Sequence, residues 1–332
     1  MALTRREFLG TSLALTTMSA LDRLSMAQNT KFHRPATVVK IVHSQVLNED
    51  GTPDPQIYQQ MVHAGLTALT QTENERAAWG QLVSSQDKIT LKINTLGLGN
   101  LPAPLKKHIV TGYQSIVASL SEIRVTPSDL VVWDMREGHL KDGGLKPGQK
   151  DDKGILCKAA ELCEYDVPFS VGGRETQLTS ILTKETTALI SICQAKSHGI
   201  AGITGALKTH YGTINNPYKF HENHCCNPGI AELNALPDVQ NKTRLIMMDA
   251  LNVVIEGGPR WNRQWLRPQN ALLFATDPVA LDRVLLEMIE TYRKEEGLGS
   301  VFTTARHVQL AGALGLGESR LDKIQVIEKT IG

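Results

Sequence analysis

The chain has 332 residues, of which 41% are hydrophobic and 21% are charged, and its formal net charge is +1. This composition is that of an ordinary globular protein with one large domain or two smaller ones. Its even charge balance excludes an electrostatic footprint for nucleic acid or for an anionic membrane. The five cysteines are too few and too scattered for a disulfide scaffold, and their odd number leaves at least one thiol free or ligating.

The N-terminal segment, residues 1–27, resembles a twin-arginine signal peptide. Arg5 and Arg6 precede a weakly apolar stretch, and small residues stand where a signal peptidase would cleave. The stretch is too short and too polar to span a membrane. We therefore expect export by the twin-arginine machinery to the periplasm or its equivalent, a linker at residues 28–35, and no membrane span after cleavage. The alternative is an ordinary basic N-terminus with a chance arginine pair.

The first half of the mature chain, residues 36–150, alternates strand and helix patterns. β-branched or alternating runs predict the strands, and apolar residues at helical spacing predict the helices. The predicted elements are strands at 36–43, 88–94 and 130–134, helices at 55–70 and through 109–120, and a loop or linker at 135–155. This order of strand, helix and strand, together with polar residues at the strand ends, is typical of a parallel α/β sheet.

The second half, residues 151–332, continues the same pattern and carries the main motifs. Asp277 is a predicted N-cap with Pro278 in the first turn of its helix. The predicted elements are strands at 187–193, 244–249, 271–275 and 321–328 and a helix at 279–292. The sequence therefore predicts an α/β fold, a mostly parallel sheet flanked by helices, in one body or two lobes.

A glycine-rich segment directly after a predicted buried strand is the first candidate site. Ligands bind at the strand ends of open α/β sheets, and glycines there leave backbone amides free for an anion. Thr204 would cap the helix that carries Lys208. Lys208 and His198 are the predicted catalytic residues. The predicted cofactor-binding residues of this segment are Lys196, Gly202, Thr204 and Gly205. The alternative is a plain glycine-rich turn with solvated side chains.

A cluster of histidines and cysteines, residues 221–226, is the second candidate. Imidazole and thiolate together favour Zn, Fe, Ni or Cu over Mg or Ca. The predicted metal ligands are His221, His224 and Cys225, with His210 from upstream. The spacing matches no structural zinc motif. A polar loop with inert thiols, or a chance histidine-rich patch, is the alternative.

Two acidic residues after the next predicted strand form the third candidate. Asp249 ends an apolar run, and Glu256 precedes a Gly-Gly-Pro turn, so both are predicted to bind a cofactor or polar ligand. A cap and a tight turn would explain them equally well. Because each follows a strand, we expect Asp249 and Glu256 to line one cleft with His198 and Lys208.

Taken in order, these motifs resemble the domain-of-unknown-function 362 (DUF362) family over about residues 88–294. The segments that carry the resemblance are 196–198, 204–208, 211–212, 249–251, 256–259 and 277–282. Some members of that family carry ferredoxin-type iron–sulfur modules, but this chain lacks their cysteine run. A fainter, local similarity links 198–208 to the nickel-dependent lactate racemase family.

These observations predict an exported protein with a metal- or cofactor-dependent active site at the strand ends. Lys208 would bind an anionic group of a small-molecule ligand or act as an acid/base, and the imidazoles and a thiolate would hold a transition metal. The rival hypothesis is a non-catalytic periplasmic binding or assembly factor that uses the same residues.

Overall fold

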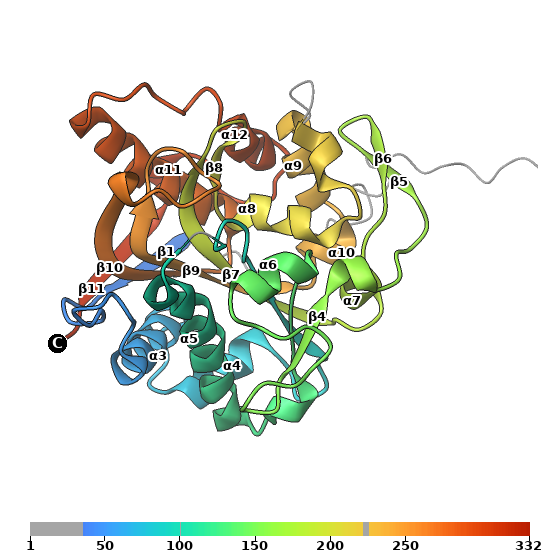
Figure 1. The fold of residues 1–332 in the computed structure, drawn as a ribbon, viewed down its shortest axis with the longest axis vertical. Coiled ribbons are helices and arrows are strands. Elements are labelled where there is room, and N and C mark those ends of the chain that lie inside the picture. Colours follow the sequence, from blue (N-terminus) through green and yellow to red (C-terminus); the bar gives the residue numbers. More distant parts are fainter. Residues whose placement is uncertain (1–35, 100, 222–225) are drawn as a thin grey trace, which may run out of the picture.

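The computed structural model of the chain describes residues 36–99, 101–221 and 226–332 (Figure 1). The predicted signal peptide and linker, together with His224 and Cys225, lie outside the described residues. Within the described ranges, no helix is both long enough and apolar enough to cross a membrane.

A nine-stranded, mostly parallel sheet runs through the described part of the chain, in the order β11-β1-β10-β9-β7-β2-β3-β4, with β8 paired to β7. Its strands are β1 (Thr37–Val42), β2 (Ile89–Ile93), β3 (Val131–Asp134), β4 (Leu156–Ala159), β7 (Ala188–His198), β8 (Gly202–Thr204), β9 (Thr243–Val254), β10 (Leu266–Ala275) and β11 (Gln325–Thr330). A separate hairpin pairs β5 (Phe169–Val171) with β6 (Arg174–Thr176). The predicted α/β fold is thus confirmed.

Parallel pairing dominates the centre of this sheet, and strands from both halves of the chain share it. β2 pairs in parallel with both β3 and β7, and β7 pairs in parallel with β9. The carboxyl ends of these four strands therefore meet at one edge. β10 is antiparallel to both of its neighbours, and β11 adds a parallel edge strand beside β1.

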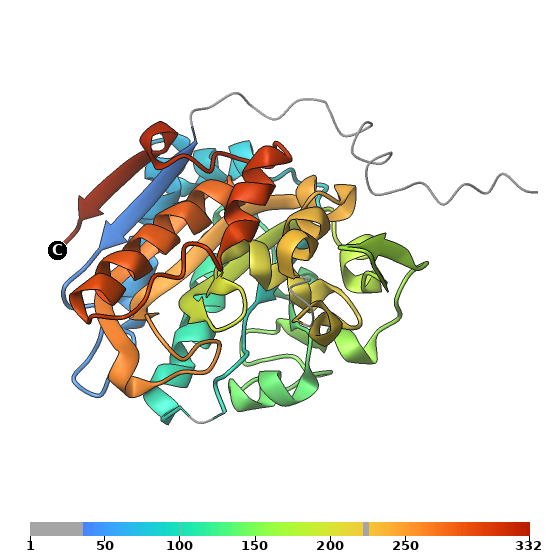
Figure 2. The same cartoon turned by 90° about the horizontal axis from the view of Figure 1, so that it is seen from above.

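Helices cover both faces of the sheet and enclose two apolar cores (Figures 1 and 2). One face is covered by α3 (Pro55–Thr70), α4 (Glu75–Leu82) and α5 (Ala103–Leu120). The other is covered by α7 (Ser180–Thr183), α8 (Ala206–Thr209), α9 (Cys226–Asn234), α10 (Pro237–Gln240), α11 (Pro278–Glu295) and α12 (Arg306–Ala313). The short α6 (Glu137–Asp142) follows β3.

Local chemistry explains where two of the three predicted helices begin. Asp54 accepts hydrogen bonds from the backbone N–H groups of Gln56 and Ile57, and so caps α3. Asp277 caps α11 in the same way, with Pro278 at its first position, as predicted. A carboxylate at this position satisfies N–H groups that the first turn leaves without partners.

Candidate functional site

Ionisable side chains are buried where the parallel strands end. Lys92 lies in β2 and Asp134 ends β3. Lys196 and His198 are among the last three residues of β7. All four are buried. Burying a charge is costly unless the charge is paired, so the partners of each group indicate which of them serve the fold and which are left for a ligand.

Lys92 and Asp134 form a complete ion pair. The Lys92 Nζ lies 2.6 Å from Asp134 Oδ1 and donates a second hydrogen bond to the carbonyl of Ile93. The other oxygen of Asp134 accepts from the backbone N–H and the hydroxyl of Thr95. The pKa of Asp134 is lowered, because these partners outweigh the effect of burial. This pair serves the fold, and both of its charges are satisfied internally.

Lys196 is fully buried and has only weak partners. Its Nζ donates to the carbonyl of Leu96 at 2.9 Å and lies 5.9 Å from the centre of the Trp261 ring. No carboxylate among the described residues lies within ion-pair distance of its Nζ. Burial lowers the pKa of Lys196 to about 7, and the more distant charge of Asp134 only partly opposes this.

Lys208, on α8, is 6% exposed and likewise has no acidic partner within the described ranges. Its Nζ lies 2.9 Å from Nε2 of His221 and 4.8 Å from the centre of the Tyr211 ring. Burial lowers the pKa of Lys208 to about 8. At neutral pH this side chain is therefore mostly a buried ammonium ion without a counter-charge among the described residues.

The protonation of His221 follows from its neighbours. Nδ1 of His221 lies 3.0 Å from the carbonyl of Pro217, which can only accept, so Nδ1 carries the proton. Nε2 then presents a lone pair to the ammonium of Lys208. Burial and the charge of Lys208 lower the pKa of His221 to about 4, so its ring is neutral at pH 7.

His198 has the opposite tautomer. Its Nδ1 accepts hydrogen bonds from the backbone N–H groups of Ile200 and Ala201, both at 3.1 Å, so the proton is on Nε2. Burial, followed by the charge of Lys208, lowers the pKa of His198 to about 2. The ring stacks on His221 with 5.3 Å between centroids. His198 is therefore a fixed hydrogen-bond donor through Nε2, and not a base.

The start of α8 is held by a carboxylate from α11. Asp282 accepts from the backbone N–H groups of Ala206 at 2.6 Å and Leu207 at 3.0 Å. A Cβ at Gly205 would lie 2.0 Å from Asp282 Oδ1, which explains the glycine. The hydroxyl of Thr204 is buried without a partner and does not cap the helix. The expected role of Thr204 as a cap is therefore wrong, and these two amides are not free for an anion.

Gly202 has a packing role. Its φ is +78°, and a Cβ there would lie 2.6 Å from the backbone nitrogen of Ala305. The β7–β8 turn therefore lies against the loop that precedes α12. Neither a positive φ nor this close approach would tolerate a larger side chain.

Asp249 and Glu256 do not join Lys208. Asp249 points to the opposite face of the sheet, where its Oδ2 lies 3.6 Å from Nδ1 of His108 on α5. Glu256 forms an ion pair with Arg293 of α11. The expectation of a single cleft with both carboxylates is wrong. The physical reason is that side chains alternate between the faces of β9, and Arg293 already neutralises Glu256.

The predicted metal ligands are only partly described. Nδ1 of His210 lies 2.6 Å from the side-chain oxygen of Asn234, and Nε2 of the same ring is buried without a partner. His221 has its Nε2 lone pair directed at Lys208. In the described part of the chain, no group of three or more histidine, cysteine or acidic side chains could hold a metal ion.

A further histidine near Lys208 gave no sequence signal. His307 of α12 is 0% exposed, and within the described part of the chain both of its ring nitrogens lack hydrogen-bond partners. Burial and the charge of Lys208 lower the pKa of His307 to about 3, so the ring is neutral. Lys92 was also missed, although a lysine inside the apolar run of residues 89–93 was a detectable signal.

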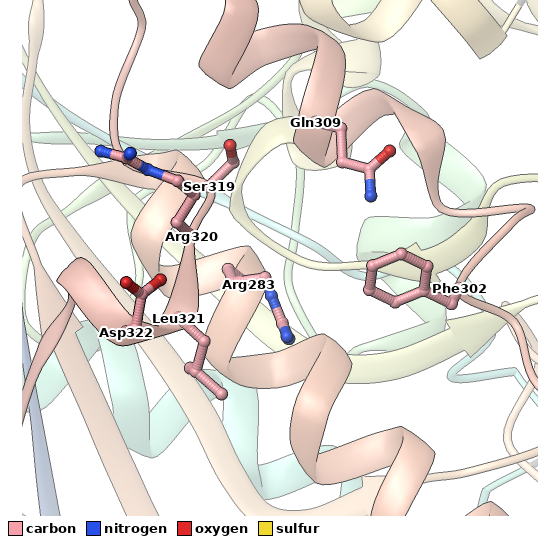
Figure 3. A pocket seen from close by; sticks show the side chains of 7 residues that line it. All are labelled: Arg283, Phe302, Gln309, Ser319, Arg320, Leu321 and Asp322. Atoms are coloured by element: carbon pink, nitrogen blue, oxygen red, sulfur yellow. The ribbon is translucent and has the colours of Figure 1, made fainter.

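A cavity lies elsewhere, between α11, α12 and the turn before β11 (Figure 3). It measures about 640 Å³ and includes Arg283, Arg320 and Phe302 in its lining. Arg283 is paired with Glu287, and Arg320 is paired with Glu318. The guanidinium charges of this cavity are thus already neutralised, whereas the ammonium of Lys208 has no acidic partner among the described residues.

Comparisons with known proteins support the family and little more. The family described as "Domain of unknown function (DUF362)" matches residues 89–287, more than half of the chain. No curated protein matches. A crystal structure of a structural-genomics protein from Thermotoga maritima is similar with a TM-score of 0.42 and 10% identity, over 79% of this chain and 59% of that chain. The chain thus spans under two thirds of that structure, and so weak a likeness supports no functional conclusion.

Proposed function

The chain belongs to the DUF362 family, and we propose that it is an enzyme that binds a small oxyanionic molecule, such as a carboxylate or a phosphate, at the ends of its parallel strands. The observation that carries this proposal is the buried ammonium of Lys208, which has no carboxylate partner among the described residues. A buried charge without a counter-charge lowers stability. An anionic ligand would supply the missing charge.

The neighbours of Lys208 support an oxyanion rather than another kind of ligand. His198 offers a fixed N–H donor because its Nδ1 is held by two backbone amides. Lys196, whose lowered pKa is partly due to the charge of Lys208, adds a second buried amine that can donate to an anion. Charge-assisted hydrogen bonds from such donors to an oxyanion are strong, and stronger still where water is excluded.

Lys208 is also the group best suited to move a proton. Burial lowers its pKa to about 8, close to the operating range of a general acid or base. The lone pair of His221, 2.9 Å away, accepts a hydrogen bond from the ammonium and so orients it. In this role Lys208 would bind the oxyanion as an ammonium and exchange a proton with it.

Two substitutions of Lys208 separate binding from proton transfer. Lys208→Met removes the charge, and we expect it to abolish binding of acetate or inorganic phosphate in a calorimetric titration. Lys208→Arg keeps a charge that cannot be lost at working pH, so we expect it to retain binding but to show no turnover in a screen of small carboxylates and phosphate esters. Equal binding by wild type and Lys208→Met would contradict the proposal. Unchanged turnover by Lys208→Arg would exclude Lys208 as the group that moves the proton, whereas binding without any turnover by wild type would favour a non-catalytic binding protein.

A transition-metal site at His221 is the second candidate. A histidine that ligates a metal through one nitrogen usually donates the other N–H to a carbonyl or carboxylate, and the Nδ1–H of His221 donates to Pro217. His224 and Cys225 would complete the ligands, and Zn, Fe, Ni or Cu would suit them. Bound there, such an ion would act as a Lewis acid. In the structure the ammonium of Lys208 faces the Nε2 lone pair of His221, which is the lone pair that a metal ion would need.

Export by the twin-arginine pathway completes the proposal. It rests on Arg5 and Arg6 and the weakly apolar stretch that follows them in the sequence. The site would then act outside the cytoplasm.

A further inference from the structure

We propose that His307 is a ligand-contacting, specificity-determining residue, and that the oxyanion bound beside Lys208 carries a hydrogen-bond donor of its own. This inference rests on the proposed function and identifies the class of ligand more closely. Suitable ligands are hydrogen phosphate, or a carboxylate with a neighbouring hydroxyl or amide group.

The position of His307 is fixed by the packing of α12. The loop before this helix lies against Gly202 of β8, where a Cβ would come 2.6 Å from the nitrogen of Ala305. From the other side, the amide of Asn227 in α9 contacts the carbonyl of Thr304 at 3.4 Å. β8 and α9 are also the neighbours of α8, which carries Lys208. His307 is therefore held on the Lys208 side of the sheet, and the charge of Lys208 acts on both His307 and His198.

The buried nitrogens of His307 are unusual. Each buried polar group without a partner lowers stability, and His307 has two such atoms at 0% exposure. Other buried histidines of the chain are better satisfied. His108 lies 3.1 Å from the carbonyl of Gly51 through Nε2, and its Nδ1 faces Asp249. A purely structural role would be filled better by an apolar side chain than by His307.

The chemistry of a neutral imidazole identifies the ligand group. One ring nitrogen of His307 donates and the other accepts. Lys208 and His198 offer only donors to the ligand, which suits the acceptor oxygens of an oxyanion. The hydroxyl of Thr204 in β8, buried without a partner among the described residues, can donate or accept. His307 thus adds a ring-nitrogen acceptor that Lys208 and His198 lack, and an N–H or O–H of the ligand would satisfy it.

Two matched variants test this inference in the full chain. His307→Leu removes both unpartnered nitrogens at similar volume, so we expect an unchanged or higher melting temperature together with weaker ligand binding. The control, His108→Leu, removes a satisfied histidine on the opposite face of the sheet. We expect it to lower the melting temperature and leave ligand affinity unchanged.

The probes are two pairs of anions that differ in one donor. Hydrogen phosphate has an O–H that sulfate lacks, and glycolate has a hydroxyl that acetate lacks. We expect wild type to prefer the first member of at least one pair by roughly tenfold, about one hydrogen bond, and His307→Leu to lose that preference.

The outcomes separate this inference from the proposed function. If wild type binds the four anions with the same preferences as His307→Leu, the proposed role of His307 is contradicted. The proposed function is not affected by that result. A fall in melting temperature for His307→Leu as large as that for His108→Leu also contradicts the role of His307, because it would show that His307 is satisfied within the fold. Failure of wild type to bind any of the four anions contradicts the proposed function, and the inference falls with it.

Discussion

Replacement of either buried lysine, Lys92 or Lys208, by methionine should change the free energy of unfolding, but not in the same direction. Lys92→Met leaves Asp134 as a buried carboxylate without its cation, 2.6 Å from where the ammonium was. Breaking such a pair costs about 3–5 kcal/mol, so we expect the free energy of unfolding to fall by about this amount.

Lys208→Met instead removes a charge that the described fold does not neutralise. Burial lowers the pKa of Lys208 from 10.5 to about 8, and each pH unit of such a change corresponds to about 1.4 kcal/mol. The charged form therefore costs up to about 3 kcal/mol at pH 7, part of which the contacts with Tyr211 and His221 offset. We expect the free energy of unfolding to stay level or rise by up to that amount.

Urea unfolding at pH 7 measures the free energy of unfolding of both variants. Equal dependence of that free energy on urea concentration would show that the variants expose similar surface on unfolding. The pH adds a second check with a definite sign. Between about pH 8 and 10.5 the unfolded chain keeps the proton of Lys208 while the folded chain has lost it, so wild type gains stability in that window. The gain in unfolding free energy of Lys208→Met over wild type should therefore become smaller between about pH 8 and 10.5. If Lys208→Met destabilises the protein as strongly as Lys92→Met, Lys208 has a counter-charge, and the reasoning is refuted.

Three further outcomes are expected. Oxyanion affinity should fall as the pH rises through about 8, because the ammonium of Lys208 is lost; a titration that shows affinity constant to pH 9.5 would exclude Lys208 as the anchor. If the metal proposal holds, His221→Ala should lower the transition-metal content of purified protein, measured by elemental analysis, whereas the exposed His63→Ala should not; equal content in both variants would rule out His221 as a ligand. Arg5→Lys together with Arg6→Lys should leave the precursor in the cytoplasm on cell fractionation, and normal export would show that the pair is not a signal.

Periodicity and caps in the sequence predict the larger elements of this fold well. The Asp54–Pro55 and Asp277–Pro278 pairs mark helix starts because a carboxylate satisfies free N–H groups and proline fits the first turn. Short elements were missed. β4 has four residues and α12 has eight, and such lengths leave too few repeats for a period to be recognised. The glycine-rich loop of residues 135–155 was expected, but it also contains α6.

The candidate site was predictable only where one segment supplies it. Lys196 and His198 lie at the end of β7 and Lys208 lies on α8, which follows soon after, so their gathering follows from the strand-end rule. Asp249 could not be placed, because an error of one residue in the register of a strand moves a side chain to the other face. His307 comes from an element distant in the sequence, and only tertiary packing reveals that its nitrogens lack partners.

The central claim is that an oxyanion binds between Lys208 and His198. A crystal structure of the protein grown with selenate or bromoacetate would test it directly, because both anions give an anomalous signal. The account predicts a peak within hydrogen-bonding reach of Lys208 Nζ and His198 Nε2, and no such peak in Lys208→Met. A peak confined to the cavity at Arg283 and Arg320, or no peak at the strand ends at a saturating concentration, would contradict it.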